Sequence, residues 1–333
     1  MSVLVHPPQG RQPCSGEADP IVIGLVNNMP DAALRATERQ FLELLSAASG
    51  GHTVHLRFLS VPQIPRGETG RTHISFYESI GEVWDDHFDG LIVTGTEPRA
   101  RVLEDEPYWP TLATLADWAE HHTVSTIWSC LAAQIAVLRA DGIARRPFGW
   151  KLSGVFPCTK AADHAITAGF PQCWCVPQTR YNDLPEQALS ASGYRILSRL
   201  PDAGADIFVR ERGSLFLFIQ GHPEYDPESL FREYRRDIAR FLSGERDTYP
   251  DPLQGYFDED TATALDAFRW RALHTRDAAL LLSLPDAVAG WQPTHSWREP
   301  AIRLYANWLF FLAQRKYGTA GLVETRSDVA ASL

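Results

Sequence analysis

Residues 124–138 read VSTIWSCLAAQIAVL, and this stretch decides the class of fold. Its first five residues have the β-branched and apolar composition of a buried strand, and the Ala-rich run from Leu131 is typical of a helix. Cys130 lies at the junction of the two. A strand that turns directly into a helix places this thiol at the carboxyl edge of a sheet and at a helix N-terminus, the position of a nucleophile elbow.

The alternation of strand and helix continues on both sides of this stretch. Apolar runs predict further strands at 21–26, 54–59, 90–94, 195–197, 206–209 and 215–219. Helical spacing predicts helices at 32–48, 109–121, 131–140, 226–242 and 299–315. We therefore expect an α/β fold, a mostly parallel sheet with helices on both faces. Short, charged connections near 195–219 favour antiparallel pairing at one end of the sheet.

The domain organisation follows from length and local composition. With 333 residues, 44% of them hydrophobic, the chain can bury one large core. Pro, Gly and Ser crowd residues 1–20, which predicts a loose tail before a single domain at 21–320. Residues 256–293 read as a helical addition towards the C-terminus, and 321–333 as a frayed tail.

Charge and cysteine content exclude several classes of protein. The net charge of −10 is unfavourable for binding nucleic acid. The sequence contains neither an apolar run of about 20 residues nor a signal-peptide pattern, so we expect a cytoplasmic protein without a membrane partner. Five cysteines form no complete disulfide set, and Cys173-x-Cys175 has no second pair at zinc-binding spacing, so we expect free thiols and no metal site.

Cys130 is the candidate nucleophile. The N–H groups at a helix N-terminus stabilise a thiolate, and the N–H of Leu131 is placed to donate to an oxyanion, with Gly95 at the end of a neighbouring strand. The alternative interpretation is a small buried core residue, the commoner fate of a lone cysteine.

A second group of residues, Gly221-His-Pro-Glu224, follows the strand at 215–219 on the same edge of the sheet. His222 can take a proton from a thiol, and Glu224 can orient the imidazole. Alone, the tetrapeptide is more simply a turn, but next to a thiol elbow it favours a Cys-His-Glu catalytic set. Candidate cations for an anionic substrate are Lys151, Arg180 and Arg236, although most Lys and Arg side chains only solvate a surface.

Six stretches together resemble the homoserine O-acyltransferase family, which works through a cysteine on a class I glutamine-amidotransferase-like fold and is often called homoserine O-succinyltransferase. They are Asn27-Asn-Met-Pro30 with Thr37-Glu38, FDGLIVTG at 88–95 with Tyr108-Trp109, STIWSCLAAQ at 125–134, KLSGV at 151–155, GHPEYD at 221–226 with Arg236-Asp237, and Trp297-Arg298 with Asn307-Trp308-Leu309. Their order is that of the family, which is more specific than any one motif.

The resemblance implies a reaction with two half-reactions. Cys130 would take a succinyl or acetyl group from acyl-CoA as a thioester, His222 would act as general base, and Glu224 would support it. The acceptor would be the hydroxyl of homoserine, in methionine biosynthesis, with acyl-CoA as co-substrate and no bound cofactor.

The resemblance also implies an acceptor site. Lys151, Thr179 and Arg236 fall where the family binds the amino acid, Arg180 follows them, and the planar cation of Arg236 suits an α-carboxylate.

Four departures from the family leave substrates open. Asp31 follows Met29-Pro30 where the family has Lys, and Gln178 and Thr179 replace His and Ser, so serine or another hydroxy amino acid is an alternative acceptor. Arg99 falls at the position linked to the choice between succinyl-CoA and acetyl-CoA. Residues 256–293 have no counterpart in the family, and a cover for the site and a subunit contact in a homodimer are both open interpretations.

Two other classes of function remain as alternatives. A glutamine amidotransferase-like cysteine hydrolase usually has the elbow G-x-C-x-G, whereas this chain has Trp128-Ser-Cys-Leu-Ala132. A non-catalytic binding module is the other, because a fold does not by itself fix a function.

Overall fold

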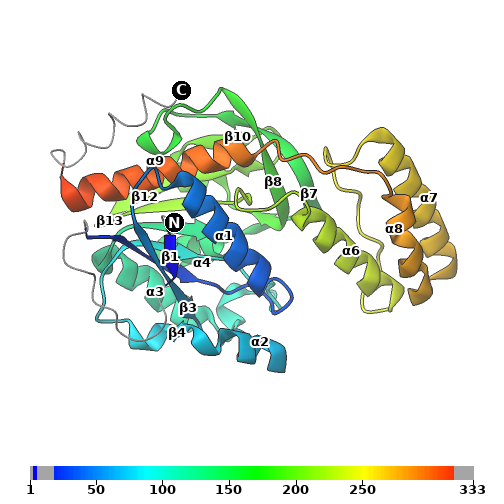
Figure 1. Ribbon diagram of the computed structural model, residues 1–333, viewed down its shortest axis with the longest axis horizontal. Helices are drawn as coiled ribbons and strands as arrows, with labels where there is room; N and C mark the ends of the chain where they lie inside the picture. The colour runs from blue at the N-terminus through cyan, green and yellow to red at the C-terminus, as the bar shows by residue number, and fades with distance from the viewer. Residues whose placement is uncertain (1–2, 6–18, 319–333) are drawn as a thin grey trace.

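The computed structural model describes residues 3–5 and 19–318 and has a central sheet between two layers of helices (Figure 1). Within these residues the strand order is β1-β3-β2-β5-β6-β13-β12-β9, with β4 beside β3. The bounds are β1 Val3–Val5, β2 Ile21–Val26, β3 Val54–Ser60, β4 Glu78–Ser79, β5 Phe88–Val93, β6 Thr123–Ser129, β9 Arg195–Ile196, β12 Ile207–Arg212 and β13 Ser214–Ile219. All pairs up to β6–β13 are parallel, and β12 and β9 are added antiparallel. The predicted α/β fold and its antiparallel end are confirmed.

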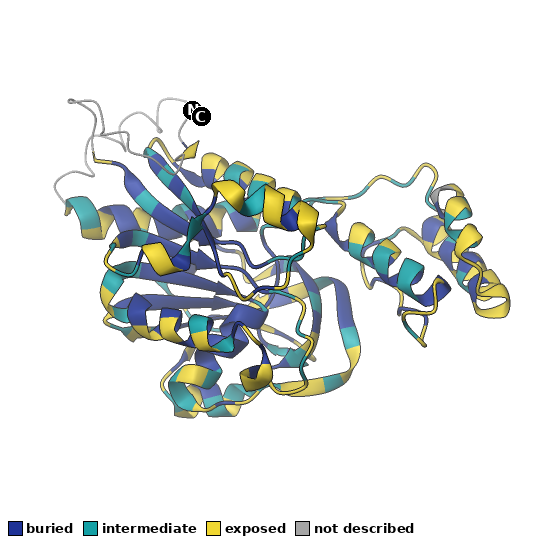
Figure 2. Ribbon diagram, turned by 90° about the horizontal axis from the view of Figure 1, so that it is seen from below, coloured by how far each residue is buried: buried dark blue, intermediate teal, exposed yellow. Residues whose placement is uncertain are grey.

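Helices cover both faces of the sheet. One layer contains α1 (Leu34–Ala48) and α9 (Arg298–Tyr317), and the other contains α3 (Trp109–His122) and α4 (Leu131–Asp141). Alternate residues of a strand face opposite layers: in β13, Leu217 packs towards α9 and Phe218 towards the opposite layer. Figure 2 shows the resulting pattern, with buried strands between helices whose outer sides are exposed. The remaining helices are α2 Glu68–His73, α5 Glu186–Ala191, α6 Ser229–Leu242, α7 Glu259–Thr275 and α8 Leu284–Ala287.

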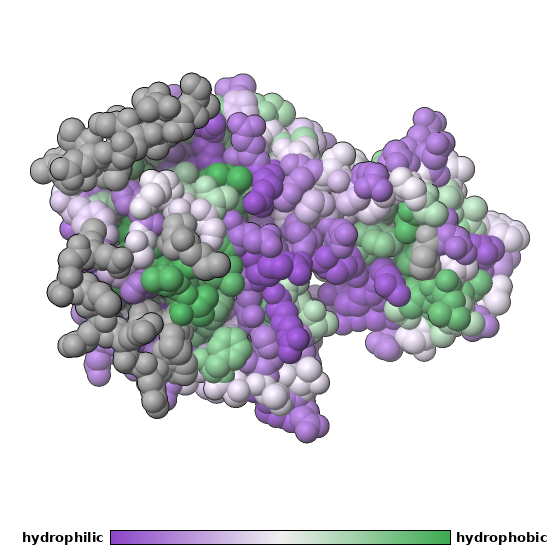
Figure 3. Space-filling view, viewed as in Figure 1, coloured by the Kyte–Doolittle hydropathy of each residue, from purple (hydrophilic) through white to green (hydrophobic). Residues whose placement is uncertain are grey.

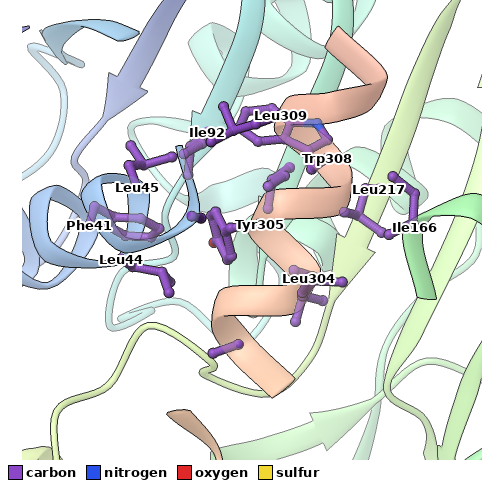
Figure 4. Close-up of a cluster of buried hydrophobic side chains, with 14 of the residues drawn as sticks. Phe41, Leu44, Leu45, Ile92, Ile166, Leu217, Leu304, Tyr305, Trp308 and Leu309 are labelled. Atoms are coloured by element: carbon purple, nitrogen blue, oxygen red, sulfur yellow. The ribbon is translucent and has the colours of Figure 1, made fainter. Parts of the chain in front are cut away.

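The C-terminal helix α9 is part of the core. Trp308 and Tyr305 of α9 are buried between the sheet and Phe41 of α1 (Figure 4). The indole nitrogen of Trp308 donates to Ser125 Oγ of β6 at 2.9 Å. A Cβ atom on Gly90 would lie 2.7 Å from the Trp308 ring, so glycine is needed there for this close approach.

A second, four-stranded antiparallel sheet was not expected. Its order is β11-β10-β7-β8, with bounds β7 Arg146–Lys160, β8 Cys173–Asp183, β10 Ser198–Leu200 and β11 Gly204–Ala205. Cys158 lies on β7, and Cys173 and Cys175 lie on β8. Pro157 and Pro177 interrupt the hydrophobic alternation that marks a strand, which hid this hairpin. The described cysteines are free, as predicted, and Cys14 lies outside the described residues.

Helices α6, α7 and α8, with the 3₁₀ segment at Ala278–Ser283, form an arm that projects from the body (Figures 1 and 2). They share an apolar cluster of their own that includes Leu230, Ile238 and Phe268, so the helical prediction for 256–293 is confirmed. Figure 3 shows apolar side chains on the surface of this arm, where Trp270 and Leu282 are exposed.

The prediction of a loose tail at 1–20 is wrong at its start, because Val3–Val5 form strand β1. This strand pairs in parallel with β3 and buries Val3. The rest of that prediction, at 6–18, and the frayed tail at 321–333 lie outside the described residues. Within the described part of the chain, no helix has both the length and the hydropathy to cross a bilayer.

Candidate active site

The elbow at Cys130 is formed where β6 ends and α4 begins. Cys130 is the N-cap residue of α4, with φ 50° and ψ −111°, a backbone region that residues other than glycine rarely adopt. Its N–H donates to the Ile219 carbonyl oxygen at 2.7 Å, so the neighbouring strand β13 holds the turn. Backbone strain of this kind persists only where the surroundings fix it, and here it presents the half-buried thiol at the carboxyl edge of the sheet.

Gly95 lies directly against the elbow. A Cβ atom at this position would lie 3.1 Å from the Leu131 nitrogen and 3.3 Å from the Ser129 carbonyl oxygen, so the absence of a side chain keeps the approach open. The N–H of Leu131, in the first turn of α4, has no acceptor within its own helix. Its predicted role as an oxyanion donor fits this position and stays a prediction.

The imidazole of His222 lies against Glu224, as the sequence predicted. Nδ1 of His222 and Oε1 of Glu224 are 2.8 Å apart, and both side chains are 7% exposed. Burial on its own lowers the pKa of His222, but the Glu224 carboxylate and the neighbouring Cys130 thiol raise it well above its usual value. A proton on His222 and a negative charge on Cys130 therefore stabilise each other.

The loop before His222 is held from behind by a buried polar group. The N–H of Gly221 donates to Asp206 Oδ1 at 3.0 Å, and Gln178 Nε2 donates to the same oxygen at 2.7 Å. The N–H of His222 donates to the Pro177 carbonyl oxygen at 2.9 Å. Gln178, one of the departures from the family pattern, thus positions the His222 loop and does not enter the cleft.

Arg180 is placed differently from the other predicted cations. Its side chain is 1% exposed, and its guanidinium donates to the Gln178 side chain, to Asp183 and to the Ala203 carbonyl oxygen. Although Arg180 borders the cleft, these internal partners occupy its donors. Its position is that of a residue that supports the loop.

Lys151, Thr179 and Arg236 meet around two acids of α6. Lys151 Nζ lies 2.9 Å from Asp237 and 3.5 Å from Glu233, and Thr179 donates to Glu233 at 2.7 Å. Arg236 pairs with Asp237 at 3.0 Å. Burial raises the pKa of Glu233, but Lys151 and Arg236 bring it below its usual value. This charged cluster contains both signs of charge at the surface of one cleft.

The cleft itself has a volume of about 760 Å³, part of it open to solvent. It brings together most of the predicted site residues, namely Cys130, Leu131, Lys151, Thr179, Arg180, His222 and Arg236, with Glu224 behind His222. Arg99 is not among the lining residues, and its side chain is exposed. Within residues 3–5 and 19–318, no three His, Cys, Asp or Glu side chains are grouped as they would be to hold a metal ion.

Comparison with known proteins identifies the family of this chain. The family model for homoserine O-succinyltransferase matches residues 9–317. The chain belongs to this family. A homoserine O-succinyltransferase of Rhodopseudomonas palustris is 49% identical over 90% of both chains, and one of Methylorubrum extorquens is 48% identical over 88% of this chain and 87% of its own. A glutamine amidotransferase structure from Methylobacillus flagellatus, 16% identical, covers 88% of this chain and 94% of its own with a TM-score of 0.52, which shows the shared fold.

In this member of the homoserine O-succinyltransferase family, the carboxylate of Asp31 has partners within the protein. This carboxylate accepts from the Gly67 N–H at 2.7 Å and lies 3.3 Å from the guanidinium of Arg66. Arg66 also donates to the Asn27 carbonyl oxygen, so it ties the loop from Asn27 to Asp31 together. Met29 and Pro30 of that loop line the cleft.

Sequence reasoning missed two residues of the site. The ring of Tyr225 stacks on His222 with centroids 4.4 Å apart, and its hydroxyl donates to Glu233 at 2.5 Å. Glu233 thereby connects the His222 loop to Thr179 and Lys151. The available signal was spacing, because Glu233 lies three residues before Arg236 on the predicted helix and therefore on the same face.

Proposed function

We propose that this protein transfers a succinyl group from succinyl-CoA to the hydroxyl of homoserine through a thioester on Cys130. The observation that supports it most is the elbow: a strained cysteine at a helix N-terminus shares a cleft with His222, whose partner is Glu224. Family membership supports the choice of substrates, because the relatives of closely similar length are named for succinyl transfer to homoserine.

In the first half-reaction, Sγ of Cys130 attacks the thioester carbonyl carbon of succinyl-CoA. The new C–S bond forms, the bond to the CoA sulfur breaks, and the departing sulfur takes the proton held by His222. The oxyanion formed in between faces the N–H of Leu131 at the start of α4. CoA leaves, and the succinyl group remains on Cys130.

In the second half-reaction, neutral His222 removes the proton from the acceptor hydroxyl. The hydroxyl oxygen attacks the thioester, the C–S bond to Cys130 breaks, and the proton on His222 again balances the thiolate. The charged cluster suits a zwitterionic amino acid: Arg236 for the α-carboxylate and Glu233 for the α-ammonium group. Exchange of the two substrates at one site gives ping-pong kinetics.

This activity places the protein in methionine biosynthesis, with acyl-CoA as a co-substrate that leaves after each turnover and no bound cofactor. A cytoplasmic location belongs to the same proposal, because both substrates are small, charged metabolites. The homodimer predicted from the sequence stays a prediction.

The test is acylation in the absence of acceptor. Purified protein incubated with succinyl-CoA should gain the mass of one succinyl group on the peptide that contains Cys130, and homoserine should remove it as an ester. Cys173→Ser is the matched control, because Cys173 is an exposed thiol outside the cleft. The proposal is wrong if the adduct forms equally in Cys130→Ala, or if the protein hydrolyses glutamine and leaves succinyl-CoA unchanged.

A panel that crosses succinyl-CoA and acetyl-CoA with homoserine and serine separates the remaining substrates. We expect the highest kcat/KM for succinyl-CoA with homoserine. Binding of an acyl-CoA and an amino acid without release of free CoA would instead indicate a non-catalytic binding module.

A further inference from the structure

One cation in the cleft has no carboxylate partner within the described part of the chain. The other lysine and arginine residues that line the cleft each form a salt bridge with Asp or Glu; they are Lys151, Arg180 and Arg236. Arg145 has instead two long hydrogen bonds of 3.5 Å, to the Gln134 side-chain oxygen and to the Arg101 carbonyl oxygen. A half-buried cation without a counter-charge is unfavourable, and such a site is suited to the anionic group of a ligand.

Arg145 lies on the Cys130 side of the cleft. It follows α4 in the chain, and its hydrogen-bond partner Gln134 lies one helical turn beyond Cys130, with a backbone hydrogen bond of 3.3 Å between them. Side chains one turn apart have Cβ atoms about 5–6 Å from each other. Burial lowers the pKa of Arg145, and Tyr108, Glu106 and Cys130 act in the opposite direction. Arg145 and Cys130 line the same cleft.

One acid near Arg145, Glu106, is engaged by backbone groups. Glu106, whose charge also raises the pKa of Arg145, accepts hydrogen bonds from the N–H groups of Arg99 and Ala100 at 2.5 Å. It therefore holds the loop before α3 and forms no salt bridge with Arg145 within the ionic-contact distance of 4.0 Å. The two long hydrogen bonds of Arg145 use two of the five N–H donors of its guanidinium, and Arg145 lines the cleft.

The two ends of the cleft match the two substrates of the proposed reaction. The acceptor is a zwitterion, and it fits the charged cluster of Lys151, Arg236 and Glu233, which has both signs. The succinyl group of the donor has a carboxylate and no cation. Three C–C bonds of about 1.5 Å each separate the carbon of this carboxylate from the thioester carbonyl carbon. A lone cation beside the nucleophile is the complement of that group.

We propose that Arg145 binds the distal carboxylate of the succinyl group and thereby selects succinyl-CoA over acetyl-CoA. This inference rests on the proposed function and adds the residue that determines its donor. A planar guanidinium can bind a carboxylate through two parallel hydrogen bonds. Arg99, to which the sequence assigned donor choice, is exposed and outside the cleft lining, so we transfer that role to Arg145.

The test measures Cys130 acylation by both donors in wild type, Arg145→Met and Arg145→Lys. Arg145→Met should lower kcat/KM for succinyl-CoA by about 10- to 100-fold, the usual effect of losing a hydrogen-bonded charge pair. Acetyl-CoA, which has no distal carboxylate, should stay within about threefold of wild type. Arg145→Lys should recover part of the preference, because it keeps the charge without the planar geometry.

A truncated donor separates the succinyl carboxylate from the phosphates of CoA. The succinyl thioester of N-acetylcysteamine has the carboxylate and no phosphate. Cys130 of the Arg145→Met variant should therefore still be acylated more slowly than wild type by this thioester. Unchanged acylation by this thioester, with equal losses for both CoA donors, would mean that Arg145 binds CoA phosphate and would overturn the inference. A higher KM for homoserine with normal succinylation would assign Arg145 to the acceptor and would also overturn it.

Arg146→Met is the matched control, because Arg146 is the next residue, its side chain is 65% exposed, and it pairs with Asp183 on the second sheet. It should leave both donors unchanged. Thermal unfolding of each variant shows whether the fold is intact. The wild-type measurements decide the proposed function separately: without succinylation of wild-type Cys130 the function itself fails, whatever Arg145 does.

Discussion

The two ends of the cleft are built in different ways. At the Cys130 end the geometry is set by the backbone. Cys130 has φ 50°, Gly95 packs on the elbow, and the Gly221 N–H donates to Asp206. At the charged cluster the geometry is set by long side chains, with Lys151 and Arg236 shared between two acids of one helix. The first end has little room to adjust, whereas the second can redistribute its partners.

Substitutions at the two ends of the cleft should therefore affect different steps of the reaction. Changes at the elbow or behind His222 should reduce the chemical steps, because reacting atoms must keep their alignment. Changes in the charged cluster should mainly alter acceptor affinity, because neighbouring charges partly replace a lost one.

The largest effect is expected at Cys130. Cys130→Gly should abolish acyl transfer and at the same time stabilise the fold by about 1–2 kcal/mol, since glycine accepts a positive φ without strain. Urea unfolding of wild type, Cys130→Gly and Cys130→Ala provides the measurement. Cys130→Ala, which removes the thiol and keeps the Cβ atom, should be equally inactive without this gain, and a Cys130→Gly less stable than Cys130→Ala would contradict the strained elbow.

Gly221→Ala should have the next largest effect. An added Cβ atom would lie 2.6 Å from Val176, 2.7 Å from Gln178 and 2.9 Å from Asp206, so the loop must shift and displace His222. We expect a loss of roughly 100-fold in kcat and of about 1–3 kcal/mol in the free energy of unfolding. Gly81→Ala is the matched control, because its nearest neighbour would be 3.6 Å away. Normal kcat in Gly221→Ala would show that the loop tolerates displacement.

Glu224→Gln should change the pH dependence of deacylation. In the acyl-enzyme the thiol is blocked, so Glu224 is the group of the catalytic set that keeps the pKa of His222 raised. Deacylation needs neutral His222 and is lost as the pH falls below that pKa. Removing the carboxylate lowers the pKa of His222, so the acidic limb of the pH profile should move to lower pH. The rate on the plateau should fall about 10-fold, because Glu224 no longer orients the imidazole. Single-turnover transfer from succinyl-Cys130 to homoserine measures this, and a shift of the limb to higher pH would contradict it.

How much the sequence could predict depends on whether a pattern is local. The strands of the parallel sheet are continuous apolar runs, and Cys130 and His222 follow two of them, so their meeting at one edge could be inferred. The hairpin β7–β8 could not, because Pro157 and Pro177 conceal its alternation and its pairing is set by residues far apart in sequence. Thr179 and Lys151 both line the cleft. Only the family resemblance pointed to Thr179, whereas Lys151 was also a candidate cation without it.

The roles of individual charges were even less predictable. Arg180 lies in β8 and Arg145 directly precedes β7, and the sequence gives no means of telling which of the two has internal partners. The burial of Arg180 against Asp183, and the absence of a salt bridge from Arg145 within the described chain, are consequences of tertiary packing. Such differences appear only when the fold is known.

The smallest effect is expected from Glu233→Gln in the charged cluster. The glutamine side chain has nearly the same shape and can still accept from Thr179, but it loses the charge that faces Lys151 and Arg236. Asp237 also pairs with both cations, so the cluster stays largely in place. We expect KM for homoserine to rise by about 10-fold, with the rate of Cys130 succinylation unchanged, because in the proposed reaction the lost charge binds the acceptor and not the acyl donor.

Glu228→Gln, at the N-cap of the same helix, is the control for Glu233→Gln, because Glu228 is 67% exposed and pairs locally with Arg232. It should alter neither constant. If Glu233→Gln slowed succinylation as much as it weakened homoserine binding, the two ends of the cleft would be coupled, through Tyr225 and its stack on His222. The ratio of the two effects therefore measures how independently the backbone-built end and the side-chain-built end of this cleft operate.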